Sequence, residues 1–236
     1  MTRYIEQTKT LAFSLVAILP LIFVYEYFIP QFHELQFIEL RNTSELLIKN
    51  SLGYLGLTEW WHFGLIYLAF TVIVFVRARQ NYEAFPNPIY VGGFLLECVT
   101  YAVIFGFVTK FITGFLLSLQ TLANAETQRY LPQFLFAIAA GVYEEILFRL
   151  LFLGSLLILF NALLPSKRTV QISLAALISA VVFSLYHYPS FEVFEWNSFT
   201  YRFIAGGILS LLYVYRGLAV SVYTHALYNI FLLIRE

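Results

Sequence analysis

Three groups of polar side chains stand inside stretches that are otherwise apolar enough to cross a membrane. They are Glu144, Glu145 and Arg149; His187, four residues after Phe183; and His225, four residues before Asn229. Ionisable groups inside a bilayer are unfavourable, so they need partners or a function. A carboxylate, two imidazoles and an amide can supply a general base and hydrogen-bond donors for an oxyanion. These are the groups that hydrolysis of a peptide bond needs.

Helical geometry predicts different roles for Glu144 and Glu145. Residues four apart share a face of an α-helix, so Glu145 and Arg149 are predicted to form an ion pair. Glu144 is turned by about 100° from Glu145 and faces a different neighbour, which makes it the candidate general base. The alternative is a buried ion network that only orients helices.

The two histidine pairs also predict shared faces. Phe183 lies one turn before His187 and would pack beside the imidazole and exclude water. His225 and Asn229 would point the same way and donate two hydrogen bonds to one oxygen, and Asn229 would fix the His225 tautomer. The ordinary interpretations are an interfacial histidine for His187 and helix–helix hydrogen bonding for the other pair.

The composition predicts a polytopic membrane protein. Of the 236 residues, 60% are hydrophobic and 12% are charged, about half the charged share of a soluble domain. The net charge of zero gives no indication of a nucleic-acid partner. No aspartate is present, which excludes a Ser-His-Asp triad and paired aspartates, and neither His-Glu-x-x-His nor Gly-x-Ser-Gly occurs. Cys98 is the only cysteine, so it is interpreted as a buried thiol.

Hydropathy predicts an all-α membrane bundle of about seven transmembrane helices, within a range of six to eight. The predicted spans are residues 11–29, 60–76, 91–118, 132–164, 170–187, 199–215 and 218–234. The fourth is too long for a hydrocarbon core of ~30 Å, so it must tilt, break or run along the surface. Residues 80–90, 119–131 and 188–198 are predicted as loops.

The chain is expected to form one integrated membrane domain with two parts. Residues 1–129 would supply N-terminal transmembrane helices and an interfacial helix, which begins at the capping signal Asn42–Glu45 and ends near Gly53. Residues 130–236 would form the catalytic helix core. Glu26, near the end of the first span, is expected to be interfacial.

Loop charges predict the orientation of this integral, multi-pass protein. Seven Lys and Arg residues fall on the side of the N-terminus and five on the other side, which predicts a cytoplasmic N-terminus. His187 lies near the end of its span on the non-cytoplasmic side. A site built around it would open away from the cytoplasm. Either the predicted orientation is inverted or the substrates are exported, and the second is favoured.

The order and spacing of the motifs carry a family resemblance. Glu-Glu-x-x-x-Arg, then Phe-x-x-x-His, then His-x-x-x-Asn, over residues 130–234, resemble the CPBP family of CAAX-processing and bacteriocin-processing intramembrane proteases, also called the Abi family. The resemblance implies that Glu144 and His187 activate a water molecule. It implies that His225 and Asn229 stabilise the oxyanion, while Glu145 and Arg149 brace the site.

The resemblance favours a metal-free, glutamate-type mechanism without a firm cofactor. Zinc held by Glu144, His187 and His225 is the alternative. The implied partners are the lipid bilayer and a membrane-associated peptide or protein, either a prenylated CAAX protein or another processed peptide. Two other classes compete: a proton-coupled transporter, whose path would include Glu97 and Lys110, and a non-catalytic immunity or scaffold protein.

Overall fold

The regular elements of the structure, a computed structural model, are all helices within the residues that it describes. These residues are 2–33, 42–59, 61–79, 88–116, 130–165, 167–188 and 194–235. The helices are α1 (Thr2–Thr8), α2 (Leu11–His33), α3 (Thr43–Gly53), α4 (His62–Arg79), η2 (Pro88–Tyr90), α5 (Val91–Leu116), α6 (Tyr130–Ala139), η3 (Ala140–Glu144), η4 (Ile146–Leu153), α7 (Gly154–Leu163), α8 (Arg168–Leu185), α10 (Trp196–Arg216) and α11 (Leu218–Arg235). The predicted loops lie largely outside the described residues.

The predicted all-α membrane bundle is confirmed. Five described segments are long and apolar enough to cross a membrane: Leu11–Gln31, His62–Arg79, Pro88–Gly114, Gln133–Leu163 and Arg168–Leu185. Helices α10 and α11 cover the predicted sixth and seventh spans but are not among these five, and α11 contains the shorter apolar stretch Leu218–Ile234. Helix α1 was not predicted, because hydropathy carries no signal for a short polar helix.

The overlong fourth span is a run of successive helices, α6, η3, η4 and α7, whose middle is not α-helical. Residues Ala140–Glu144 and Ile146–Leu153 form π-helices, with Glu145 at the junction between them. A π-helical turn closes a wider ring of residues than an α-turn and is frequently found at functional sites. The double glutamate therefore lies in locally widened helix, which the sequence analysis had treated as regular α-helix.

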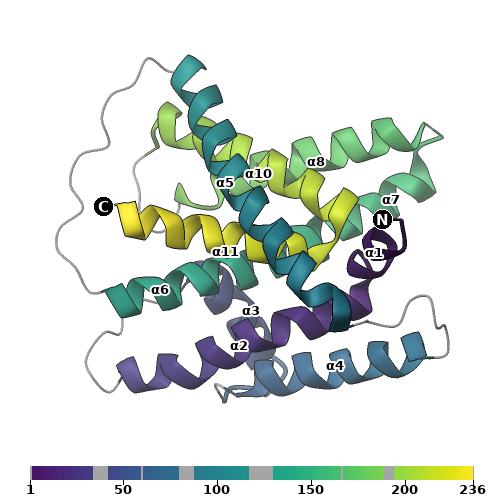
Figure 1. Cartoon of the computed structure of the whole chain (residues 1–236), viewed down its shortest axis with the longest axis vertical. Helices are drawn as coiled ribbons and strands as arrows, with labels where there is room; N and C mark the ends of the chain where they lie inside the picture. The colour runs from purple at the N-terminus through teal and green to yellow at the C-terminus, as the bar shows by residue number, and fades with distance from the viewer. Residues whose placement is uncertain are drawn as a thin grey trace.

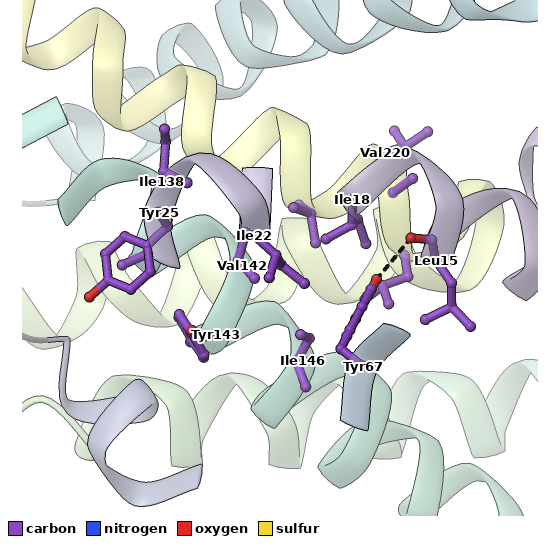
Figure 2. Packing of buried hydrophobic residues seen from close by; sticks show 14 of the residues in the cluster. Leu15, Ile18, Ile22, Tyr25, Tyr67, Ile138, Val142, Tyr143, Ile146 and Val220 are labelled. Carbon is purple, nitrogen blue, oxygen red and sulfur yellow. Dashed lines mark hydrogen bonds between the residues drawn. The ribbon is translucent and has the colours of Figure 1, made fainter. Parts of the chain in front are cut away.

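Helix α2 lies in the lower part of the view in Figure 1 and packs against α4, α6 and α11. Its apolar side chains interdigitate with those of η3, η4 and α11 (Figure 2). The side chains in this contact include Leu15, Ile18, Ile22, Val142, Ile146 and Val220. Tyr67 of α4 donates a hydrogen bond of 3.2 Å to the Leu15 carbonyl oxygen. Cys98 is fully buried in the same cluster, which confirms the predicted buried thiol.

The two termini lie at opposite ends of the bundle (Figure 1). At the N-terminal end, Arg216 donates to both carboxylate oxygens of Glu97, at 2.6 and 2.7 Å, and to Thr8 Oγ1 at 3.1 Å. Tyr4 also donates to Glu97, at 2.5 Å. These bonds fasten α1 to α5 and α10. The Glu97 carboxylate therefore has a charged partner in a distant helix.

Helix α3 lies against η3 and begins and ends as its capping signals predicted. The Asn42 side-chain oxygen accepts a hydrogen bond of 2.8 Å from the Ser44 N–H, and the helix ends at Gly53. An N-cap of this kind satisfies one of the free N–H groups of the first turn.

Glu26 was expected to be interfacial, and the structure shows in addition that it has partners inside the protein. Its side chain is buried, 2.9 Å from the Lys49 ammonium, and accepts a hydrogen bond from Tyr143. Lys49 also contacts Glu45 at 2.9 Å, and Glu45 accepts from Tyr25. This buried carboxylate is stabilised because Lys49 of α3 supplies the opposite charge. The cluster joins α3 to α2 and η3.

Candidate active site

A cavity of about 490 Å³ opens between α3, α5, α6, α8, α10 and α11, near the end of the bundle that holds the C-terminus. Glu144, His187, His225 and Asn229 all line it. They come from η3, from the turn after α8 and from α11. The remaining wall is mainly aromatic and apolar, with Phe105, Phe136, Phe183, Tyr186, Tyr201, Ala205, Leu209, Tyr228 and Leu232.

The two oxygens of the Glu144 carboxylate have different neighbours. Its Oε1 accepts a hydrogen bond of 2.8 Å from Asn42 Nδ2. Its Oε2 lies 3.9 Å from Nε2 of His187 and 3.9 Å from Nε2 of His225. These separations exceed a direct hydrogen bond. The free oxygen therefore faces both imidazoles across a narrow polar gap.

The hydrogen-bond partners of Nδ1 determine the tautomers of His187 and His225. His187 Nδ1 lies 2.8 Å from the Phe183 carbonyl oxygen, which can only accept, so Nδ1 carries the proton. His225 Nδ1 lies 2.9 Å from Glu145 Oε1, so this carboxylate accepts its proton. Asn229 was expected to fix the His225 tautomer, and that expectation is wrong because Glu145 occupies the Nδ1 side. Each Nε2 faces Glu144.

Glu145 and Arg149 form the predicted ion pair, and neither side chain lines the cavity. Both side chains are fully buried, and Arg149 Nε is 3.3 Å from Glu145 Oε2. Glu145 also accepts a hydrogen bond from Ser221 of α11. Arg149 donates to the Gly206 carbonyl oxygen at 3.4 Å. The pair thus connects η4 with α10 and α11, the helices that carry the rest of the site.

Phe183 separates the ion pair from the cavity. Its ring lies 4.5 Å from the Arg149 guanidinium carbon and 5.0 Å from the His187 ring centroid. The His225 ring is 6.4 Å away. A guanidinium over an aromatic face is a favourable contact, and an edge-to-face ring pair fixes the orientation of the imidazole. Phe183 packs beside His187 as the spacing predicted.

Two side chains that bond to these groups, Asn42 and Ser221, were not predicted as site residues. Asn42 was identified only as a helix cap, yet it also binds Glu144, which lies 102 residues later in the chain. A capping signal is local and contains no information about a contact at that separation. Glu97 does not line the cavity, since it is engaged at the opposite end of the bundle.

Glu144, His187 and His225 are the residues that would hold a zinc ion. Zinc bonds of 2.0–2.1 Å in a tetrahedron place neighbouring ligand atoms about 3.3–3.4 Å apart. Here Oε2 is 3.9 Å from each Nε2, so the ligands would have to move closer. Among the described residues, no three His, Cys, Asp or Glu side chains are arranged to hold a metal ion. The site as it stands does not fit zinc.

Comparison with known families identifies the part of the chain that carries this site. The family model described as type II CAAX prenyl endopeptidase Rce1-like matches residues 126–231. No curated protein and no solved structure matches the chain. Members of the matched family are membrane-embedded proteases that act on membrane-associated protein substrates. The match covers less than half of the chain, and it agrees with the resemblance to the CPBP family that the three motifs predicted.

Proposed function

We propose that this protein is an intramembrane endopeptidase of the glutamate type, which hydrolyses a peptide bond of a membrane-associated peptide or protein. One observation carries the proposal: the free oxygen of Glu144 lies 3.9 Å from Nε2 of two imidazoles at the wall of one cavity. Polar groups at such a separation are commonly bridged by water.

The first step is attack by water. Glu144 Oε2 and His187 Nε2 can each accept a hydrogen bond from one water molecule, because the Nδ1 proton of His187 is engaged by the Phe183 carbonyl. A lone pair of that water is then directed at the scissile carbonyl carbon. The new oxygen–carbon bond forms while the water proton passes to Glu144, and the carbonyl oxygen gains a negative charge.

The second step is stabilisation and breakdown of that oxyanion. His225 donates from Nε2 when its ring is doubly protonated, and the Glu145 carboxylate on Nδ1 stabilises this imidazolium. Asn229, on the same face of α11, supplies the second donor. The proton held by Glu144 passes to the leaving nitrogen as the carbon–nitrogen bond breaks. The products are a carboxylic acid and an amine.

The experiment compares Glu144→Gln with a matched control in purified, lipid-reconstituted protein. The substrates are internally quenched peptides ending in a CAAX sequence, with and without a farnesyl group on the cysteine. Glutamine keeps the size and the hydrogen bond from Asn42 but cannot accept the water proton. We therefore expect Glu144→Gln to melt like the wild type and to lose cleavage. Glu6→Gln makes the same change at an exposed position and should cleave normally.

Cleavage retained by Glu144→Gln would refute the proposed base. A wild-type protein that cleaves no peptide, combined with a function that survives the joint substitution of Glu144 and His187, would instead favour the scaffold class. Proton flux through proteoliposomes that depends on Glu144 without proteolysis would favour a transporter. Cleavage restricted to the farnesylated peptide would identify the substrate class as prenylated.

A further inference from the structure

The N-terminus of α3 lies against η3 and contacts the proposed base, Glu144. Asn42 is 4% exposed, lines the cavity and donates a hydrogen bond of 2.8 Å from Nδ2 to Glu144 Oε1. It lies outside the segment that matches the family model, which begins at residue 126. The contact therefore joins the N-terminal part of the chain to the proposed catalytic part.

We propose, on the basis of the proposed function, that Asn42 is a positioning residue that orients the Glu144 carboxylate for water activation. Its donor occupies Oε1, and this leaves Oε2 as the oxygen that faces His187 and His225. The bond prevents rotation of the carboxylate about its terminal carbon–carbon bond.

The orientation of the amide is determined by its other end. Asn42 Oδ1 accepts a hydrogen bond of 2.8 Å from the Ser44 N–H, which can only donate. The Nδ2 group must therefore point toward Glu144. Two hydrogen bonds in opposite directions hold the side chain in one rotamer, so the donor meets the carboxylate without further ordering.

Helix α3 is itself held in place close to this contact. Lys49, two turns after the cap, lies 2.9 Å from Glu26 of α2 and 2.9 Å from Glu45. Tyr143, the residue before Glu144, donates to the same Glu26. Neighbouring residues of η3 are thus bonded to α2 and to α3. This double attachment supports the position of the Asn42 donor relative to the carboxylate.

Capping alone does not explain why this residue is asparagine. Serine, aspartate and asparagine cap helices about equally well, because each offers an oxygen to the first-turn N–H groups. Asparagine alone among them combines that acceptor with an amide donor on the same group. The Nδ2 donor is unused by the cap and is the atom that contacts Glu144. Substitution by serine therefore separates the two roles.

The test compares Asn42→Ser with Asn50→Ser, the same exchange at an exposed position of the same helix. Serine preserves the cap but is too short to reach Glu144. With the quenched farnesylated CAAX peptide as probe, we expect Asn42→Ser to lower kcat about 10- to 100-fold, as for loss of a hydrogen bond to a charged group. The KM should stay unchanged, and the melting temperature should fall by no more than the loss of one buried hydrogen bond explains. Asn50→Ser should resemble the wild type in all three.

A second measurement requires no substrate. Dicyclohexylcarbodiimide modifies carboxyl groups in apolar surroundings, and mass spectrometry can follow its addition to Glu144. Asn42→Ser frees Oε1 from its hydrogen bond, so labelling of Glu144 should be faster in this variant and unchanged in Asn50→Ser. Unchanged kcat together with unchanged labelling in a folded Asn42→Ser protein would overturn the inference. Cleavage by Glu144→Gln would refute the proposed function. Loss of cleavage in Glu144→Gln together with full activity of Asn42→Ser would refute the role of Asn42 alone.

Discussion

Gly141 permits the close approach of η3 and α11 that brings Glu144 near His225. A Cβ at this position would lie 2.6 Å from Cβ of Ala226, 2.8 Å from its backbone nitrogen and 2.9 Å from its Cα. Ordinary contacts of a Cβ begin at 3.4 Å. Because two of the three atoms belong to the backbone, a side-chain rotation cannot relieve the overlap. Gly141→Ala must move η3 and α11 apart by close to an ångström.

The displacement acts directly on the site. Ala226 follows His225 in the chain, and Glu144 lies less than one turn after Gly141. The gap of 3.9 Å between Glu144 Oε2 and His225 Nε2 would widen. Overpacking of a buried contact destabilises by about 1–3 kcal/mol. A misplacement of about 1 Å in a catalytic arrangement lowers the rate about 100-fold. We expect Gly141→Ala to show both effects.

The assay measures peptide cleavage and thermal melting in the same detergent preparation. Gly207→Ala is the matched control, because a Cβ on Gly207 meets nothing within 4 Å. That control should cleave normally and should melt at the same or a slightly higher temperature, since alanine is the better helix former. A Gly141→Ala protein with wild-type cleavage and wild-type melting would refute the reasoning, because the overlap would then be absorbed elsewhere.

Three further predictions concern the ion pair, a turn and metal dependence. Glu145→Gln leaves a fully buried guanidinium without its countercharge, so unfolding should become easier by about 3–5 kcal/mol, and unchanged melting would contradict the pair's structural role. Gly217→Ala combines a φ of 89° with a Cβ 2.7 Å from the Lys9 carbonyl oxygen, so it should lower the melting temperature without changing kcat per folded molecule, and a wild-type melting temperature would argue against strain there. Treatment with phenanthroline should leave cleavage unchanged, whereas a loss that added zinc restores would favour the metal alternative.

The predictable part of the fold rests on hydropathy and on short helical spacings. Apolar runs of suitable length predicted each of the seven long helical segments, since composition alone decides whether a segment can enter a bilayer. The ion pair of Glu145 with Arg149 followed from their spacing of four residues. The cap at Asn42 followed from local sequence. Each of these inferences depends on residues that are neighbours along one helix.

The features that were missed depend on contacts between distant helices. Glu26 was expected to be interfacial from its place near the end of the first span, and its pairing with Lys49 of another helix was not predicted. Asn229, on the same helix, was expected to fix the tautomer of His225, whereas the carboxylate of Glu145 determines it. The π-helical turns around Glu144 carry no periodicity that distinguishes them from α-helix. The roles of the cavity residues remain predictions.

The burial of Cys98 has a practical consequence for studying movement in this protein. A chain whose single thiol is shielded from solvent already behaves, toward maleimides and spin labels, like a cysteine-free background. Probes can therefore be attached at chosen surface positions of α3 and α10 without first removing a native residue. Distances between such probes, recorded with and without a bound peptide, would report directly whether the two sides of the cavity separate to admit it.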